Sequence, residues 1–181
     1  MLLNSISLSL LFAVGLATAA RNGSYTVHDL GKRKQEILNN GGGVWDIAIA
    51  MLESEKMITD YPYGDNKSGD STNFGIFKQN WFMLRTSTSQ FKGQSDKDVD
   101  HGAVLNRDLK ADIKARQESQ KFYGADKWFG GHRNGQTGLK YYQTPDINDY
   151  KNGVNWIHDQ LASNKKYLSD DTRFWVDVTP I

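Results

Sequence analysis

The chain has 181 residues, with 22 Lys and Arg against 21 Asp and Glu, four His and no Cys. The resulting net charge of +1 argues against nucleic acid as the main partner, because neutralisation of phosphates by basic side chains dominates that affinity. The absence of cysteine excludes disulfides, thiolate nucleophiles and cysteine-ligated metal sites.

Residues 1–20 carry no charged side chain and contain a short apolar run, residues 8–16, followed by small residues. This pattern is typical of a cleaved secretory signal. It is too short for a membrane span, which needs about 20 apolar residues, and no basic flank follows, so an anchor is the less favoured alternative. We expect a secreted, extracellular protein whose mature part, residues 21–181, is one domain without a membrane segment.

The rest of the chain reads as helical segments around one region rich in Gly, Asp and Asn. Apolar spacing predicts helices over residues 29–39, 44–57, 77–84, 96–117 (starting at 96 or 98) and 149–168. The helix over 44–57 is the most apolar and should be central. Residues 61–76 predict two or three short strands with tight turns, and residues 128–138 predict a loop. Asp112 and Arg116 are expected to form a surface ion pair.

Several kinds of chemistry find no support in the sequence. The four histidines, His28, His101, His132 and His158, lie far apart and form no zinc-binding motif. There is no Gly-x-Ser-x-Gly nucleophile elbow and no phosphate-binding P-loop. We therefore expect no metal and no cofactor, and attention turns to the carboxylates.

Glu53 lies near the end of the apolar helix, with Ile49 one turn before it and Met57 one turn after. Apolar neighbours disfavour the charged carboxylate, so its pKa should rise, as a general acid requires. An equally good interpretation is that Glu53 is an ordinary helix carboxylate that points to water. Glu55 is flanked by apolar residues just as well, and periodicity does not choose between the two.

The Gly-rich region supplies candidates for a second carboxylate, Asp65 and Asp70, each next to a glycine in a predicted turn. Their default role is to bond their own backbone. The functional alternative is a carboxylate kept ionised by solvent, which could activate water. One protonated and one ionised carboxyl group across a cleft is the arrangement that hydrolyses glycosides.

Three stretches carry a resemblance to a known family: residues 50–54 (AMLES), 61–70 (YPYGDNKSGD) and 73–81 (NFGIFKQNW). They resemble the catalytic core of lysozyme-type enzymes, and more closely glycoside hydrolase family 134, the secreted endo-β-1,4-mannanases with a lysozyme-like fold. The resemblance covers most of the mature chain. It implies an α+β, lysozyme-like fold, mostly helical, with a small β-hairpin region after the central helix.

The resemblance also implies an activity, the inverting hydrolysis of β-1,4-mannan. Glu53 matches the general acid of the family and Asp65 its general base, so the resemblance favours Glu53 over Glu55. Asp70 is kept as a reserve base because it shares the same region. An inverting mechanism predicts the two carboxyl groups about 6.5–9.5 Å apart, which leaves room for a water molecule.

A neutral polysaccharide is held by stacking aromatic rings and by amide and hydroxyl groups. Our candidates for substrate contacts are Tyr61, Tyr63, Asp70, Asn73, Gln79, Asn80, Trp81, Trp128, His132 and Arg133. Phe77, Trp81 and Phe82 are equally compatible with the core because of their near-helical spacing. His132 could be a structural hydrogen-bond partner.

Two other functions stay open. The lysozyme-like fold would permit a muramidase or chitinase, although such enzymes are often strongly basic and rich in disulfides, unlike this chain. A secreted carbohydrate-binding or inhibitor-like protein could keep the fold without the chemistry. We expect a monomer, because no extended apolar stripe is left over for a partner.

Overall fold

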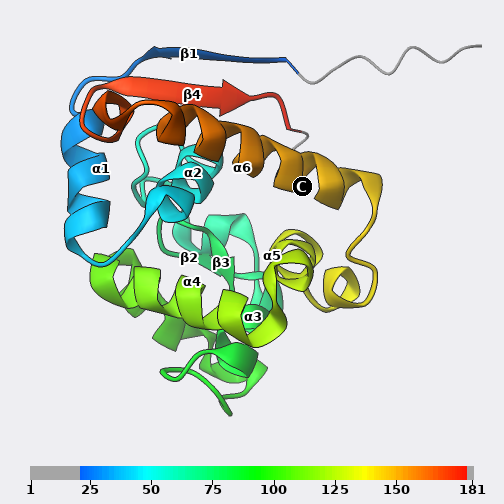
Figure 1. Cartoon of the computed structure of the whole chain (residues 1–181). Helices are drawn as coiled ribbons and strands as arrows, with labels where there is room; N and C mark the ends of the chain where they lie inside the picture. The colour runs from blue at the N-terminus through cyan, green and yellow to red at the C-terminus, as the bar shows by residue number, and fades with distance from the viewer. Residues whose placement is uncertain (1–20, 179–181) are drawn as a thin grey trace, which may run out of the picture.

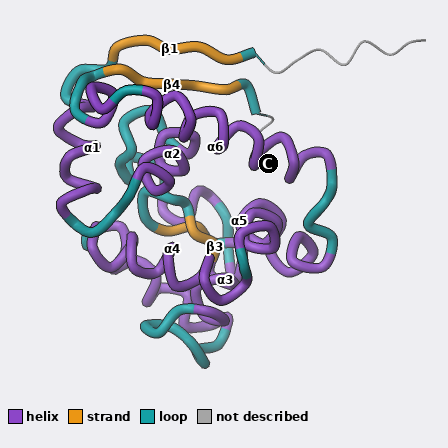
Figure 2. Tube along the Cα trace, in the orientation of Figure 1, coloured by secondary structure: helices purple, strands orange, loops and turns teal. Residues whose placement is uncertain are grey.

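The computed structural model describes residues 21–178. The predicted secretory signal over residues 1–20 lies outside the described residues. The described helices are α1 (Leu30–Asn39), α2 (Val44–Glu53), α3 (Trp81–Ser87), α4 (Leu109–Tyr123), α5 (Ala125–Lys140) and α6 (Pro145–Ser163). Short 3-10 segments are η1 (Tyr63–Asn66), η2 (Gly69–Ser71), η3 (Asp96–Asn106) and η4 (Lys165–Leu168). The strands are β1 (Asn22–Thr26), β2 (Asn73–Phe74), β3 (Gln79–Asn80) and β4 (Thr172–Val176). The predicted mostly helical α+β fold is confirmed, and Figure 2 shows how helices dominate the trace.

Helix α2 forms the centre of the molecule, between α6 on one side and α4 on the other (Figure 1). Its residues from Ile47 to Met51 are fully buried, and each large side chain among them contributes about 1.5–3 kcal/mol by leaving water. The central position was predicted, but the helix ends at Glu53 rather than at residue 57, because the backbone becomes extended at Ser54. Glu53 therefore stands at the very end of a rigid, buried element.

Of the two or three strands predicted over residues 61–76, the structure has only β2 there, which pairs antiparallel with β3 just beyond the region, with Asn73 opposite Asn80. Residues before it form the 3-10 turns η1 and η2. Gly64, Asp65 and Asn66 have φ values of 63°, 58° and 59°, in the left-handed region. Three successive left-handed residues curl the chain and are incompatible with a strand.

Three further predicted helices have different bounds. The one expected over residues 77–84 begins at Trp81, because Asn80 caps it by accepting a hydrogen bond from the Met83 amide at 3.0 Å. The one expected over residues 96–117 is divided into η3 and α4. Asp108 starts α4 by accepting a hydrogen bond from the Ala111 amide at 2.9 Å. The last predicted helix, over 149–168, is α6, which begins earlier and ends before η4.

The loop predicted over residues 128–138 is wrong, because these residues lie within α5. Three of its glycines, Gly130, Gly131 and Gly138, permit close packing. A Cβ on Gly131 would lie 2.5 Å from the Met83 sulfur, and one on Gly138 would lie 1.9 Å from the Gly130 carbonyl oxygen. The helical conformation is interrupted only at Asn134 and Gly135, where Gly135 has a φ of 54°.

The surface ion pair predicted between Asp112 and Arg116 is also wrong, since both side chains are buried. Asp112 accepts a hydrogen bond from the Ile76 amide at 2.7 Å and one from Gln79 Nε2 at 2.7 Å. Arg116 pairs instead with Asp46 on α2, at 2.7 Å. These groups tie α4 to the β2–β3 turn and to the central helix.

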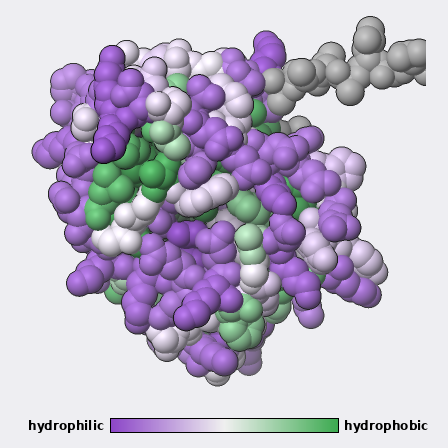
Figure 3. Space-filling view, in the orientation of Figure 1, coloured by the Kyte–Doolittle hydropathy of each residue, from purple (hydrophilic) through white to green (hydrophobic). Residues whose placement is uncertain are grey.

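The two ends of the described chain form a ribbon that was not predicted. Strand β1 pairs antiparallel with β4, with Asn22 opposite Val176, and the ribbon runs along α6 (Figure 1). Figure 3 shows a largely hydrophilic face, with hydrophobic residues gathered between α1 and α2. None of the described helices is both long and apolar enough to cross a membrane.

Candidate active site

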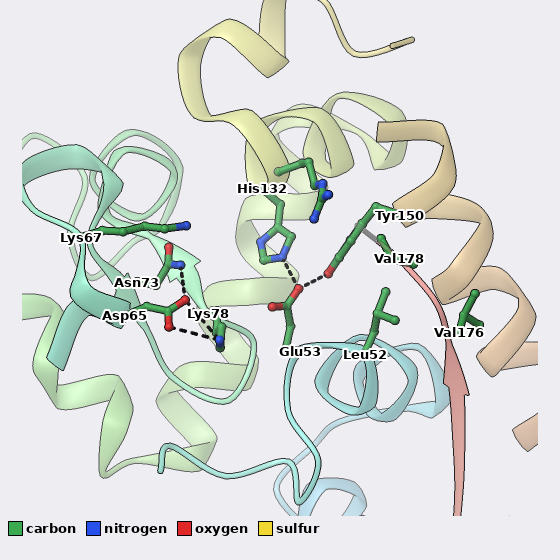
Figure 4. A pocket seen from close by; sticks show the side chains of 11 residues that line it. Leu52, Glu53, Asp65, Lys67, Asn73, Lys78, His132, Tyr150, Val176 and Val178 are labelled. Carbon is green, nitrogen blue, oxygen red and sulfur yellow. Dashed lines mark hydrogen bonds and ion pairs between the residues drawn. The ribbon is translucent and has the colours of Figure 1, made fainter. Parts of the chain in front are cut away.

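A cavity of about 320 Å³ lies at the carboxyl end of α2. It is bounded by η1, the β2–β3 region, α5, α6 and the end of β4 (Figure 4). Its lining residues are Leu52, Glu53, Asp65, Lys67, Asn73, Lys78, His132, Arg133, Tyr150, Val176 and Val178. Glu53 and Asp65, the predicted carboxylate pair, approach this cavity from different elements, α2 and η1.

Glu53 is held by two donors that bind the same carboxyl oxygen. His132 Nε2 donates to Oε1 at 3.0 Å, and the Tyr150 hydroxyl donates to Oε1 as well. His132 stacks on Trp128 with the ring centres 4.9 Å apart and the planes 8° from parallel. The other oxygen of Glu53 points across the cavity toward the Asp65 side (Figure 4). The carboxyl group is thus oriented through one oxygen and available through the other.

The pKa of Glu53 is lowered, whereas the sequence predicted that it would be raised. Burial does raise this pKa, as expected for a carboxyl group among apolar neighbours. The hydrogen bond and charge of His132, the hydrogen bond from Tyr150 and the charge of Lys78 together outweigh burial. Burial and the nearby Glu53 charge raise the pKa of Tyr150 well above its usual value, so Tyr150 remains a donor.

Asp65 lies in a different environment, on the left-handed turn η1. Lys78 Nζ contacts both carboxylate oxygens, at 3.3 Å to Oδ1 and 3.2 Å to Oδ2. Asn73 Nδ2 donates to Oδ2 at 3.3 Å. The second carboxylate of the site therefore contacts a lysine side chain, whereas Glu53 is hydrogen-bonded by an imidazole and a phenol.

Asp70 does not line the cavity that contains Glu53. Arg85 binds both of its oxygens, with Nε to Oδ1 and Nη2 to Oδ2 both at 2.6 Å. Such a bidentate pair fixes the carboxylate strongly. Asp70 lines an adjoining cavity instead.

The adjoining cavity has a volume of about 440 Å³ and shares four lining residues with the first, Lys67, Asn73, His132 and Arg133. The two cavities therefore form one groove. The other residues of the second cavity are Asp70, Ser71, Asn80, Phe82, Asn134, Gly135, Gln136 and Thr137. Of the predicted contact residues, Asp70, Asn73, Asn80, His132 and Arg133 line this groove.

The other five predicted contact residues lie outside the lining of both cavities. Trp81 and Trp128 are core side chains, with 0% and 1% of their surface exposed. Gln79 is also buried and bonds Asp112. The Tyr61 hydroxyl donates to the Gly75 carbonyl oxygen at 2.7 Å, and the exposed Tyr63 donates to Asp100 at 2.6 Å.

Sequence reasoning missed six residues that line the cavity with Glu53: Leu52, Lys67, Lys78, Tyr150, Val176 and Val178. Tyr150 had a usable signal, because it shares the buried face of α6 with Ile147 and Val154. A tyrosine on such a face needs a partner for its hydroxyl. Val176 and Val178 had no such signal, because their place at the cavity depends on the pairing of the two chain ends.

Over residues 21–178, no three His, Asp or Glu side chains gather in a way that could hold a metal ion. The chemistry that the described groove offers is that of carboxyl groups with their hydrogen-bond donors. Two carboxyl groups that face a groove lined by amides and hydroxyls can act as the acid and the base in cleavage of a glycosidic bond.

The fold and the carboxyl pair fit a glycoside hydrolase, and the family comparison shows one. The sequence model of glycosyl hydrolase family 134 matches residues 31–178, which is most of the chain. The chain belongs to this family, as its motifs predicted. A search of curated proteins finds no match.

Proposed function

We propose that the protein is a secreted, monomeric, endo-acting hydrolase of β-1,4-mannan that inverts the anomeric configuration. Glu53 is the general acid and Asp65 is the general base. The observation that carries the proposal is that these two carboxyl groups line one cavity from separate elements, each with one oxygen held by two donors.

In this mechanism Glu53 gives a proton to the glycosidic oxygen as the bond from that oxygen to C1 breaks. A water molecule attacks C1 from the opposite face of the sugar, forms the new C1–O bond and gives a proton to Asp65. The free oxygen of Glu53 is the one on the cavity side (Figure 4), which suits proton transfer to a bound sugar.

The lowered pKa of Glu53 has a consequence for this mechanism. An acid must carry its proton, and the donors to Oε1 favour the ionised form. A sugar bound over the cavity removes water from the carboxyl group, which favours the protonated form. We therefore expect activity to fall as the pH rises through the pKa of Glu53 in the enzyme–substrate complex.

The groove also supports a polysaccharide substrate. Beyond the cavity that contains Glu53 it presents amide and hydroxyl groups, from Ser71, Gln136 and Thr137, whereas the amide of Asn80 is buried and bonded within the protein. Such groups exchange hydrogen bonds with sugar hydroxyls. A groove that continues past the carboxylate pair is suited to a chain that extends beyond the cleaved bond, which favours endo cleavage.

The test is to incubate the mature protein, residues 21–181, with linear β-1,4-mannan, chitin and bacterial cell wall in parallel. Glu53→Gln and Asp65→Asn are the inactivated variants, and Glu55→Gln is the matched control, since Glu55 is an exposed neighbour outside the cavity. Products are read by chromatography, and the anomer formed first is read by NMR.

Cleavage of mannan to the inverted anomer, lost in both inactivated variants and kept in Glu55→Gln, would support the proposal. Cleavage of chitin or cell wall with mannan untouched would refute the substrate and favour the muramidase or chitinase alternative. Binding of mannan without any cleavage, equal in Glu53→Gln and the unmodified protein, would favour a carbohydrate-binding protein.

A further inference from the structure

Lys78 stands at the turn between β2 and β3, directly beside the predicted base. Its Nζ lies 3.2 Å from Asp65 Oδ2 and 3.3 Å from Oδ1. The two side chains are similarly covered, with 21% and 23% of their surfaces exposed. A partly buried ion pair in which one ammonium spans both oxygens restricts rotation of the carboxylate.

The backbone of Lys78 is unusual for a residue with a long side chain. Its φ is 48°, in the left-handed region that glycine and asparagine occupy more readily. Asp65 has a φ of 58°, so both members of the pair are in this region. Strained positions of this kind cluster at functional sites, where surrounding structure holds them in place.

The ring of Tyr61 contacts the ammonium group of Lys78. Lys78 Nζ lies 5.0 Å from the centre of the Tyr61 ring, within the range of a cation–π contact. The Tyr61 hydroxyl donates to the Gly75 carbonyl oxygen at 2.7 Å, which ties the ring to the same turn. Tyr61 therefore belongs to the support of Lys78 rather than to the lining of the groove.

We propose that Lys78 is a positioning residue for the general base, one that fixes the Asp65 carboxylate so that Oδ1 faces the attacking water. Asn73 and Lys78 together occupy Oδ2, whereas Oδ1 has only the lysine contact. A carboxylate oxygen has room for two hydrogen bonds, so Oδ1 retains a place for water. The inference rests on the proposed function, since it assigns a partner to the base of that reaction.

The test compares Lys78→Met and Lys78→Arg, with Lys151→Met as the matched control. Lys151 forms a lysine–aspartate pair with Asp126 on the surface, away from the groove. In Lys78→Met we expect kcat on mannan to fall by about 10²-fold, the cost of a misplaced catalytic group. We expect KM and mannan affinity by calorimetry to stay unchanged, because Lys78 acts through Asp65. Lys78→Arg keeps the positive charge and should recover at least part of kcat.

A second comparison separates positioning from folding. Lys78→Gly adopts a φ of 48° without strain, so it should fold, yet it should lose kcat as Lys78→Met does. In the Asp65→Asn background, Lys78→Met should reduce the residual rate no further, because both changes remove the same oriented base.

Two outcomes would overturn the inference alone, and a third would overturn it together with the proposed function. If the unmodified protein cleaves mannan and Lys78→Met or Lys78→Gly keeps full kcat, Lys78 does not position the base, although the proposed function stands. If Lys78→Met loses activity through KM alone, Lys78 binds substrate instead. An unmodified protein that cleaves no β-1,4-glycan would refute the proposed function itself, and this inference with it.

Discussion

Replacing Tyr150 by Phe removes one of the two donors on Glu53 Oε1 and leaves the ring in place. The hydroxyl of Tyr150 bonds the carboxyl group from α6, and His132 bonds it from α5 at 3.0 Å. Both hydrogen bonds favour the ionised carboxylate and lower the pKa of Glu53. Without the hydroxyl, the protonated form gains relative to the ionised one, and the pKa of Glu53 rises.

The size of the effect follows from the kind of hydrogen bond that is lost. A hydrogen bond to a charged group contributes about 1.5–3 kcal/mol. A change of about 1.4 kcal/mol alters a protonation equilibrium tenfold, which is one pH unit. Since a general acid works only while protonated, the alkaline limb of the pH–rate profile should move upward by about one to two pH units in Tyr150→Phe.

The assay is the pH dependence of kcat on linear mannan, measured for the unmodified protein and Tyr150→Phe. Tyr25→Phe is the matched control, because Tyr25 donates to the exposed Glu55 at 3.4 Å, away from the groove. We expect lower kcat at the optimum in Tyr150→Phe, since a weaker acid donates its proton less readily. An alkaline limb that stays in place or moves to lower pH would refute the reasoning, because Tyr150 would then not favour the ionised form of Glu53.

Three further predictions concern the framework of the site. Asp70→Asn should raise KM while kcat changes little, because Asp70 lines the groove and the change weakens the ion pair with Arg85 that fixes it. Asp65→Asn should instead lose about 10²–10⁴-fold in kcat. Gly75→Ala should reduce the free energy of unfolding by about 3 kcal/mol or more in chemical denaturation, because its Cβ would lie 2.0 Å from Asp112 Oδ1 at a φ of 74°. Gly69→Ala is the control: Gly69 has a φ of 54° and open space around it, so this change should cost only the backbone strain. Burial raises the pKa of Asp112 from 3.8 to about 8, so the folded state binds a proton that the unfolded state has lost. The stability of the unmodified protein should therefore fall between about pH 4 and 8, by at most about 1.4 kcal/mol per pH unit, and this fall should be absent in Asp112→Asn.

The helices that could be predicted are those in which apolar spacing and end signals agree. Helix α1 was expected over residues 29–39 and is found over Leu30–Asn39. Helix α5 was missed because Gly130, Gly131 and Gly138 resemble loop residues in the sequence. Their role depends on contacts with Met83 and with one another, which no local pattern contains. The β1–β4 ribbon was missed because it joins residues at opposite ends of the chain, and β1 is mostly exposed on both faces.

Glu53 and Asp65 line one cavity, as the resemblance implied where the local pattern left Glu55 and Asp70 open. The hydrogen bonds to Glu53 could not be predicted, since His132 and Tyr150 are 79 and 97 residues away from it. This distance explains why the direction of the Glu53 pKa was wrong. Local sequence revealed the apolar neighbours that raise it, and the fold supplied the donors that lower it. The predicted aromatic contacts failed for a related reason, because Trp81 and Trp128 fill the core instead.

The donors of the two carboxyl groups differ in kind. Glu53 is hydrogen-bonded by a phenol and an imidazole, whereas the Lys78 ammonium group contacts Asp65 directly. The charge of Lys78 also reaches Glu53 and, with the two donors, lowers its pKa. Both groups are held mainly through one oxygen, Oε1 in Glu53 and Oδ2 in Asp65, so the opposite oxygen of each is the one through which protons would be exchanged. The donors thus leave one oxygen of each carboxyl group for proton exchange, but those of Glu53 favour its ionised form, so the protonated acid of the proposed mechanism depends on the loss of water when the sugar binds.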